Sequence, residues 1–426
     1  MHLGSPIHHH LLSFTLSFIL FPSNLFLDKV EGTEPHRERR GFQVIWNMPT
    51  ARCQCRYGVS LPLDKYNIIH NSDQRFQGQN MNIFYQRRLG LYPYINRQEE
   101  KINGGLPQKG FLKAHLALTE YQFSERLHKA FSGLAVLDWE AWQPLWKWNF
   151  GARSVYRKFS KKLVRTEDPY LSEKEVKSKA MLEFELGARQ FMEETLLLGV
   201  RLFPVGLWGF YGFPSCFNNH GLGERGYTGK CHNGTEILND RLRFLWQHST
   251  ALYPSIYLWR KLAGHAHAKL MVRHRVLEAL RVASQKFSEA LPVFPYARVA
   301  FTHTSVFLNQ TDLENTLGES AALGAAGVVL WGELSFAKSK NQCVLLRDYL
   351  SSVLGEYIAS LQAGVRNCSQ RVCNGQGRCT RRDPHSLHMI PLRDANEALP
   401  LSILKSKFKC VCYRGWGGEQ CEHKTP

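Results

Sequence analysis

Two carboxylates stand directly after an apolar run in the first half of the chain. The run is Leu134 to Leu137, and Asp138 and Glu140 follow it two positions apart. If the run is a buried strand, both side chains leave it in the same direction and face one site. Carboxyl groups crowded in this way do not both ionise easily, so one keeps its proton near neutral pH and can act as a general acid. The same spacing also occurs in solvated loops and at salt-bridge sites.

Aromatic side chains follow the acid pair immediately. They are Trp139, Trp142, Trp146 and Trp148. Flat aromatic faces beside two acids suit the C–H faces of a sugar ring. The combination therefore indicates cleavage of a glycosidic bond.

Further motifs surround the acid pair in a fixed order along the chain. They are FQVIWNMP (42–49), GGLPQ (104–108), GLAVLDWEAW (133–142), GLWGFYGFP (206–214), ALYPSIY (251–257) and GESAALGAAGVVLW (318–331). In this order they resemble the animal hyaluronidase family, glycoside hydrolase family 56, over nearly the whole chain from about Gly41. The segments QNMNIFY (79–85) and LGLYPY (89–94) are most similar to the type-3 branch of that family.

Short apolar runs alternate with helical patterns between residues 40 and 365. The runs that predict strands are 42–46, 81–85, 134–137, 206–211, 255–258, 292–301 and 327–331. The clearest helical patterns are 113–131, 173–202, 236–248, 266–289 and 342–363, the second opening with a capping box of Ser172 and Glu175. This alternation predicts an α/β fold, a distorted TIM-like (β/α) barrel of about seven strands, with active-site residues at the C-terminal strand ends. The resemblance implies a distorted barrel too.

The balance of charges indicates an anionic partner. The formal net charge of +18 favours nucleic acid, a membrane surface or an acidic polysaccharide. No zinc-finger spacing, aromatic RNA-binding signature or continuous basic arm is present, so we do not expect nucleic acid. We expect an acidic polysaccharide, and the resemblance implies hyaluronan or a related anionic glycosaminoglycan. No cofactor or metal is implied, because no Cys/His cluster has zinc-ligand spacing.

Several features predict passage through the secretory pathway. The chain has 11 cysteines and sequons at Asn233, Asn309 and Asn367. Residues 1–30 contain an apolar segment that predicts a signal peptide, with an uncleaved anchor as the alternative. We expect a secreted or lysosomal monomer without a GPI anchor, because no apolar tail follows the last cysteine.

Residues 366–426 form a cysteine-rich tail whose pattern resembles an EGF-like module with an extended loop between Cys379 and Cys410. Sequence alone leaves fifteen pairings open for its six cysteines. The resemblance implies the pairs Cys368–Cys379, Cys373–Cys410 and Cys412–Cys421 in the tail, and Cys53–Cys343 and Cys216–Cys231 in the barrel. Cys55 is left over; it is either buried and inert, which we favour, or free to form an intermolecular bond.

The resemblance also implies a mechanism. Family members cleave the β-1,4 bond after N-acetylglucosamine in hyaluronan, and to some extent in chondroitin, with retention of configuration. The acetamido oxygen of the substrate is the nucleophile, which departs from the two-carboxylate scheme. Glu140 would then be the general acid and base, and Asp138 would orient the acetamide and stabilise the charge developing on its nitrogen.

Other binding residues follow from the resemblance alone. Tyr211 and Tyr257 would hydrogen-bond the acetamido group and the sugar, Trp331 would wall the acetamide pocket, and Asn47, Tyr85 and Tyr296 would line the groove. For the aromatic residues the alternative is core packing. Arg275 falls where the family has a basic groove residue that could meet a glucuronate carboxylate; the alternative is a solvated helix face.

The chain also departs from the family pattern. Gln143 stands where many members have Arg, and Ser215, Phe217, Asn219 and Thr302 replace a frequent Asp, Tyr, Tyr and Asp. Members of the type-3 branch also tend to lack that Arg. Loss of buried charges could alter the pKa of the acid, which leaves a second function open. This is a hyaluronan-binding or cell-recognition protein with little turnover; a purely structural scaffold is the third possibility.

Overall fold

The computed structural model describes residues 41–285, 290–392 and 399–425. The expected signal segment, residues 1–30, lies outside these ranges. All described residues belong to one compact unit, His36–Pro426. Within the described part of the chain, no helix is both long and apolar enough to cross a membrane.

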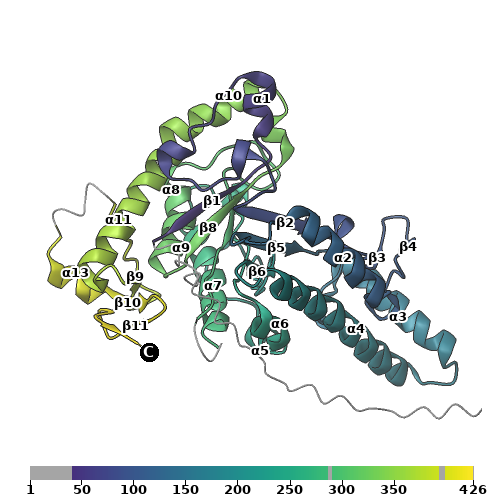
Figure 1. Cartoon of the computed structure of the whole chain (residues 1–426). Coiled ribbons are helices and arrows are strands. Elements are labelled where there is room, and N and C mark those ends of the chain that lie inside the picture. Colours follow the sequence, from purple (N-terminus) through teal and green to yellow (C-terminus); the bar gives the residue numbers. More distant parts are fainter. Residues whose placement is uncertain (1–40, 286–289, 393–398, 426) are drawn as a thin grey trace, which may run out of the picture. The chain divides into compact units, whose positions relative to one another are not determined.

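Two parallel three-stranded sheets form the centre of the fold (Figure 1). Their strand orders are β1-β8-β7 and β2-β5-β6. The bounds of these strands are β1 Gln43–Asn47, β2 Met81–Tyr85, β5 Leu134–Asp138, β6 Leu207–Phe210, β7 Tyr296–Arg298 and β8 Gly327–Trp331. Because all six strands are parallel, their C-terminal ends collect on one face, where side chains from distant parts of the chain can meet.

An irregular segment around Tyr253 joins the two sheets. It forms isolated parallel bridges from Tyr253 to Tyr211, beyond the end of β6, and from Leu252 and Ser255 to the chain around β7. The expectation of a regular strand at 255–258 is therefore wrong. Pro254 has no N–H to donate to a ladder, so pairing is interrupted at this position.

A second irregular segment lies between β1 and β2. Ile69 forms a parallel bridge with Ile45, and the Asn71 side-chain amide exchanges hydrogen bonds of 2.9 and 3.0 Å with the backbone of Met81. The six strands and two irregular segments confirm the expected distorted (β/α) barrel.

The interior of the barrel is filled by alternate residues from each strand. Its core includes Ile45, Ile83, Val136 and Val329, all buried. Side chains two positions further along the same strands also point inward, because the side-chain period of a strand is two. This places the last residue of each strand in the uppermost layer of the interior.

Helices surround the sheets (Figure 1). Their bounds are α1 Ala51–Tyr57, α2 Leu112–Arg126, α3 Ser154–Glu167, α4 Glu173–Leu202, α5 Thr235–Asp240, α6 Arg243–His248, α7 Ala266–Ala283, α8 Gln310–Leu313, α9 Glu319–Ala322, α10 Lys340–Tyr349, α11 Gly355–Cys373 and α13 Leu401–Lys407. Helices α2, α3 and α4 pack together beside β2, β5 and β6, with an apolar cluster between them and the strands.

The expected helices differ from the observed ones at four places. The helix expected at 113–131 is α2, which ends at Arg126. The expected helix 236–248 is divided into α5 and α6, and 342–363 is interrupted by a π-helical turn at Leu350–Leu354. Helix α7 ends at Ala283; the expected continuation to 289 lies partly outside the described residues. By contrast, α4 has the expected bounds and the expected capping box, with Ser172 and Glu175 each bonded to the other's backbone.

The C-terminal part follows α11 without a break. A short antiparallel pair, β9 Gly377–Arg381 and β10 Phe408–Cys412, packs against this helix, and smaller strands complete the described elements: β3 Tyr94–Ile95, β4 Lys101–Ile102, β11 Trp416–Gly417 and β12 His423–Lys424. The expected domain boundary at 365 lies inside α11. The division into a barrel and an EGF-like module stays a prediction.

Five disulfides join the pairs that the resemblance implies: Cys53–Cys343, Cys216–Cys231, Cys368–Cys379, Cys373–Cys410 and Cys412–Cys421. The first of these ties α1 to α10 across 290 residues of sequence. Cys55 is unpaired and exposed, so the expectation that it is buried is wrong. It lies near the end of a short amphipathic helix whose buried face carries Cys53 instead.

Candidate active site

The uppermost layer of the barrel interior contains most of the predicted site residues. Asn47, Tyr85, Asp138 and Trp331 are the last residues of β1, β2, β5 and β8, and each stands two positions after a buried interior residue of its strand. Tyr211 directly follows β6. The strand period of two therefore brings together side chains that are far apart in the sequence.

Asp138 is the most buried of the acids at this site. Only 8 % of the residue is exposed, and its Oδ1 has no hydrogen-bond partner among the described residues. Burial, and then the charge of Glu140, raise the pKa of Asp138 to about 8. A buried carboxyl without a partner is costly for stability and is typical of a group that binds a ligand or transfers a proton.

Glu140 stands beyond the end of β5, on the open side of the site. The Gln86 side-chain oxygen accepts hydrogen bonds from the backbone N–H groups of Glu140 and Ala141, both at 2.9 Å. Arg153 donates from Nε to the Glu140 carbonyl oxygen at 3.0 Å. Partial burial raises the pKa of the Glu140 carboxyl, and the charge of Arg153 opposes this increase. The backbone of the acid is thus fixed from two sides.

The two acids border a hollow of about 300 Å³, which we call the aromatic hollow. It is lined by Ile83, Asp138, Glu140, Tyr211, Tyr257, Tyr296, Arg298, Thr302, His303, Trp331 and Glu333. A hollow with aromatic walls and a few convergent polar groups has the composition expected of a sugar-binding site.

The aromatic walls are held in place by one another. Tyr257 stacks on Trp331 with ring centroids 6.0 Å apart, and Tyr211 meets Tyr296 edge-on at 5.0 Å. The Trp331 indole N–H donates to the Tyr85 hydroxyl at 3.1 Å. Burial raises the pKa of Tyr211 to about 12 and that of Tyr85 further, so both hydroxyls remain protonated donors at any working pH.

An ion pair closes one side of the aromatic hollow. Arg298 donates to both carboxylate oxygens of Glu333, at 2.7 and 2.6 Å, and its guanidinium lies 5.6 and 5.2 Å from the ring centres of Tyr257 and Trp331. Although burial acts in the opposite direction, the hydrogen bonds from Arg298 lower the pKa of Glu333. Glu333 therefore stays ionised when the acid pair holds a proton.

Arg298 and Glu333 were not predicted from the sequence. Arg298 is the last residue of β7, but it lies inside the longer expected strand, 292–301. Glu333 follows Trp331 at the same two-residue spacing that identified Asp138 and Glu140. The strand-end rule could have marked Glu333 as a candidate, whereas Arg298 could not be found because the end of its strand was expected three residues too late.

Arg275 lies under the loop after β6 and is half-buried, so it is not on a solvated helix face. Its guanidinium donates to the side-chain oxygens of Asn218 and Asn219 at 2.8 and 2.9 Å, and to the Ser255 carbonyl oxygen at 2.8 Å. The Tyr211 hydroxyl donates to Ser255 Oγ at 3.3 Å. Arg275 therefore holds the loop after β6 and the backbone of Ser255 together beside the site. Its contact with substrate stays a prediction.

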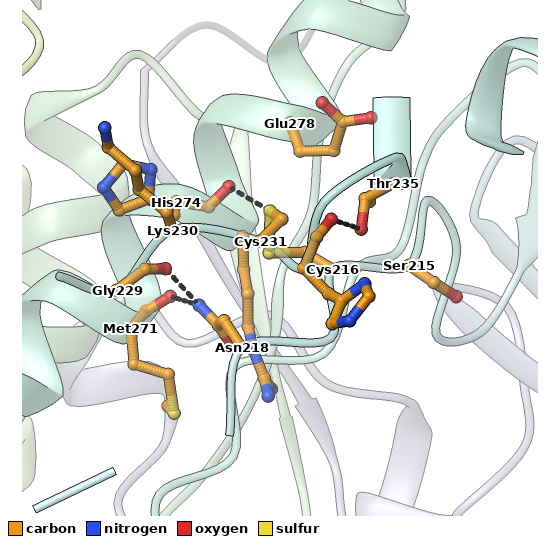
Figure 2. The surroundings of a disulfide bond; sticks show 12 residues. Ser215, Cys216, Asn218, Gly229, Lys230, Cys231, Thr235, Met271, His274 and Glu278 are labelled. Carbon is orange, nitrogen blue, oxygen red and sulfur yellow. Dashed lines mark hydrogen bonds between the residues drawn. A yellow bond between two sulfur atoms is a disulfide. The ribbon is translucent and has the colours of Figure 1, made fainter. Parts of the chain in front are cut away.

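The Cys216–Cys231 disulfide fixes the loop that carries Asn218 (Figure 2). Beside it, the Asn218 amide donates to the backbone oxygens of Gly229 and Met271, at 2.8 and 3.0 Å. These bonds join the loop to α7, which also carries Arg275. The disulfide therefore stabilises the loop that carries Asn218, the hydrogen-bond partner of Arg275. It does not border the aromatic hollow.

The tryptophans that follow the acid pair do not face the site. Trp139, Trp142, Trp146 and Trp148 are all at least 94 % buried and belong to the apolar cluster beside α4. The expectation that their faces stack on a sugar is wrong, because the chain turns into the core directly after the strand. Trp331, Tyr211 and Tyr257 provide the aromatic surface instead.

Two further predicted residues have buried polar atoms without partners among the described residues. The Asn47 amide donates to the Phe76 carbonyl oxygen at 3.3 Å, but its Oδ1 has no partner. The Tyr296 hydroxyl is likewise buried and unpaired. Together with Asp138 Oδ1, these atoms are three unused hydrogen-bonding groups in the uppermost layer and the layer directly below it, a further indication of a binding site.

The positions that depart from the family pattern have separate surroundings. Gln143 is buried, and its backbone exchanges hydrogen bonds with the Asn149 side chain at 2.9 and 2.8 Å, but it does not line the aromatic hollow. Thr302 does line it and donates to the Leu258 carbonyl oxygen at 2.9 Å. Phe217 packs edge-on against Trp148.

The three sequon asparagines differ in accessibility. Asn233 and Asn309 are both exposed, but the Asn309 side chain accepts a hydrogen bond as the N-cap of α8. Asn367 lies within α11, and its side-chain oxygen is buried. Asn233 is therefore the best placed of the three for a glycan, and glycosylation at each stays a prediction.

Comparison with known proteins places this geometry in context. A family model described as hyaluronidase matches residues 31–425. The chain is 45 % identical to Hyaluronidase-3 of Homo sapiens, over 92 % of this chain and 93 % of that protein. It is 40 % identical to Hyaluronidase-1 of Homo sapiens, over 94 % of this chain and 96 % of that protein. Both relatives are covered nearly from end to end.

A solved structure shares the fold. The crystal structure of bee venom hyaluronidase in complex with a hyaluronic acid tetramer superposes with a TM-score of 0.70 at 32 % identity. The match covers 75 % of this chain and 99 % of that one. The similarity therefore spans nearly the whole of that chain.

Proposed function

The chain belongs to the hyaluronidase family of glycoside hydrolases, family 56, and from this premise we propose that it hydrolyses the β-1,4 bond after N-acetylglucosamine in hyaluronan. The relatives named above and the hyaluronic acid bound by the bee venom protein support this substrate. Cleavage of chondroitin, which has the same alternation of uronate and N-acetylated sugar, belongs to the same proposal.

One observation carries the proposal: a buried acid, Asp138, and a more exposed one, Glu140, both with raised pKa values, border a hollow with aromatic walls. A carboxyl that stays protonated at mildly acidic pH can donate its proton to a leaving oxygen. Aromatic walls and the unpaired polar atoms of Asn47, Asp138 and Tyr296 suit a sugar that carries an acetamido group.

We assign the first step to Glu140 and the substrate's own acetamido group. The acetamido oxygen attacks the anomeric carbon, the bond to the leaving oxygen breaks, and this oxygen takes the proton of Glu140. The product is a cyclic oxazolinium ion. In the second step Glu140 removes a proton from water, which attacks the same carbon and reopens the ring, so the configuration is retained.

Asp138 has the complementary role in this proposal. In the free protein, burial makes Asp138 hold a proton. As positive charge develops on the acetamido nitrogen, the ionised form of Asp138 becomes more favourable, and the single proton of the pair is then held by Glu140. The orphan Oδ1 of Asp138 would accept the N–H of the acetamide.

We also propose that the protein works in the secretory pathway, at the cell exterior or in lysosomes. Five disulfides support an oxidising compartment during folding. A general acid must be protonated to act, and the raised pKa values of the acid pair keep a proton there at mildly acidic pH and extend this range toward neutrality.

Product analysis tests the proposed function. Purified protein is incubated with hyaluronan, and the fragments are examined by mass spectrometry and by NMR at early times. The proposal predicts new reducing ends that carry N-acetylglucosamine, first released as the β-anomer. Glucuronate at the new ends, or the α-anomer as first product, would contradict it.

Buried Gln143 favours a second candidate, a hyaluronan-binding protein with little turnover. Its side-chain oxygen has no partner among the described residues, at a position where many family members have Arg. Binding of hyaluronan without fragments at any pH would support this candidate. If loss of the Arg limits catalysis, Gln143→Arg should then raise the rate strongly.

A further inference from the structure

A second hollow, of about 450 Å³, lies beside the acid pair. We call it the arginine hollow, because it is lined by Tyr85, Gln86, Arg87, Arg88, Asp138 and Glu140. The aromatic hollow and the arginine hollow have only Asp138 and Glu140 in common. The two acids therefore stand at the junction of two hollows.

Arg87 and Arg88 present their charges to this hollow. Both are exposed, and within the described part of the chain neither guanidinium has a carboxylate within ion-pair distance. The Arg87 guanidinium lies 5.4 Å from the ring centre of Tyr94, which supports it from one side. The arginines are thus held near the acids with their charges unneutralised.

The turn that carries the two arginines is fixed to the catalytic acid. It is a single 3-10 turn, η3 Gln86–Arg88, directly after β2. Its first residue, Gln86, accepts hydrogen bonds from the backbone of Glu140 and Ala141. The position of the arginines relative to the acid pair is therefore set by the fold.

The other arginines near the site are already engaged. Arg298 is neutralised by Glu333, and Arg275 donates to two asparagine side chains and a backbone oxygen. Neither has the unpaired charge needed to recognise an anionic sugar at low energetic cost. The arginine hollow is better suited to that role than the position predicted from the sequence.

The chemistry of the substrate identifies the group that would enter. If the bond to be cleaved lies at the acid pair and the N-acetylated sugar fills the aromatic hollow, the next sugar enters the arginine hollow. In hyaluronan that sugar is a glucuronate, whose carboxylate forms strong paired hydrogen bonds with guanidinium groups. We propose that Arg87 and Arg88 bind the carboxylate of the uronate that follows the cleaved bond. This inference rests on the proposed function.

Such a subsite would position the leaving group. Holding the uronate fixes its bridging oxygen near Glu140, and binding energy from this remote group is used to orient the reacting atoms. Arg87 and Arg88 are therefore positioning and specificity residues, while the proton transfer belongs to Glu140.

The test compares two substrates that differ only at the carboxylate. The variant Arg87→Gln with Arg88→Gln is assayed on hyaluronan and on hyaluronan whose carboxylates have been reduced to alcohols. We expect kcat/KM on hyaluronan to fall about tenfold or more, in line with loss of charge-assisted hydrogen bonds, and kcat/KM on the reduced polymer to change less than about twofold. Arg87→Lys with Arg88→Lys should retain part of the activity.

A matched control separates this effect from the loss of net charge. Lys161 and Lys162 are also adjacent basic residues, they lie on α3, and neither lines the two hollows. Lys161→Gln with Lys162→Gln removes the same charge and should leave kcat/KM on hyaluronan within about twofold of the unmodified protein, as expected for surface substitutions. If this variant loses as much activity as the arginine variant, the proposal is wrong.

Binding measurements keep the inference separate from the proposed function. Affinity for a hyaluronan octasaccharide is measured in a Glu140→Gln background with and without the two arginines. Arginine-dependent binding without turnover in the unmodified protein would overturn hydrolysis and support the subsite. Equal losses on both polymers would overturn the subsite while hydrolysis stands. A larger loss on sulfated than on unsulfated chondroitin would place a sulfate there and contradict the carboxylate assignment.

Discussion

At the scale of single residues, burial of Asp138 in the acid pair lowers the stability of the fold when this carboxyl is ionised. Asp138 is buried, and its Oδ1 has no protein hydrogen-bond partner among the described residues, so its pKa in the folded state lies above that of an unfolded Asp. Between these two pKa values the folded state binds more protons than the unfolded state. The stability that a protonated Asp138 contributes is therefore complete below the pKa of Asp138 in the unfolded state. It is lost as the pH rises through the pKa of Asp138 in the folded state.

Asp138→Asn should accordingly stabilise the fold while removing activity. We expect the free energy of unfolding to rise by about 1–3 kcal/mol at neutral pH, and to change little near pH 4, because an amide has no charge to desolvate. Urea unfolding at both pH values measures this difference. The exposed Asp73→Asn serves as control, with little change at either pH. A less stable Asp138→Asn protein at neutral pH would contradict the burial argument.

Arg153 should set the alkaline limit of activity. Its positive charge lowers the pKa of Glu140, so Arg153→Gln should raise this pKa and move the alkaline limb of the kcat/KM profile to higher pH. Arg153→Lys should keep the limb in place. The control is Arg157→Gln, since Arg157 donates to the backbone oxygens of Trp146 and Lys147 and forms no ion pair with a carboxylate among the described residues. A limb that moves to lower pH would show that Arg153 acts in another way.

Only the site residues that follow a local sequence pattern could be predicted from the sequence. Asp138 and Glu140 could be recognised because the two-residue period of a strand is readable from an apolar run. Arg298 with Glu333, and Arg87 with Arg88, depend on which strand ends are neighbours in space. The four tryptophans were misinterpreted because the direction of the chain after β5 is set by packing against α4, which no local pattern shows.

At the scale of elements, the site depends on how closely the strands approach. In β6, Gly209 lies against the irregular segment that joins the two sheets. A Cβ at this position would meet the Ala251 carbonyl oxygen at 2.3 Å and the Tyr253 ring at 3.0 Å. Only glycine therefore lets β6 and this segment approach closely enough to support Tyr211.

Gly209→Ala should destabilise the barrel by about 1–3 kcal/mol, because neither the backbone nor the packed ring can move freely. Gly212 has a positive φ but open space where an added Cβ would stand, so Gly212→Ala should cost only about 1 kcal/mol through strain. Thermal unfolding of both variants decides. An equal or smaller loss for Gly209→Ala would show that the close approach is not required.

Element prediction succeeded where local signals were strong. Helix α4 has a capping box and a long apolar stripe, and its bounds were predicted from them. The strand expected at 255–258 was placed too late, because the observed bridges lie at Leu252, Tyr253 and Ser255 and Pro254 interrupts their pairing. The π-helical turn at Leu350–Leu354 was missed because it leaves no clear local signal.

At the scale of the whole molecule, a buried charge cluster joins the barrel to the C-terminal part. Glu319 on α9 is fully buried and binds Arg273 of α7, at 2.7 Å, and Arg381 of β9. Both arginines also donate to the Ser386 carbonyl oxygen, at 2.9 and 3.1 Å. One carboxylate therefore neutralises two guanidinium groups at this contact.

Glu319→Gln should weaken this contact strongly. Removing one partner leaves uncompensated buried charge, which costs about 3–5 kcal/mol. Glu314→Gln is the control, because Glu314 is 44 % exposed and its pair with Lys269 is worth at most about 1 kcal/mol. Urea unfolding followed by tryptophan fluorescence compares the two. Similar losses in both variants would mean that the buried cluster does not stabilise the molecule.

Hydrolysis in the proposed mechanism depends on Glu140 as the proton donor, and release of reducing ends from hyaluronan by Glu140→Gln is the decisive measurement of that role. The assay runs from about pH 3.5 to about pH 7, on either side of an ordinary carboxyl pKa, beside the unmodified protein and the exposed control Glu120→Gln. We predict that the rate falls at least about hundredfold at every pH, the usual size of a general-acid contribution, while binding of a hyaluronan octasaccharide persists. Undiminished hydrolysis by Glu140→Gln would show that Glu140 is not the proton donor.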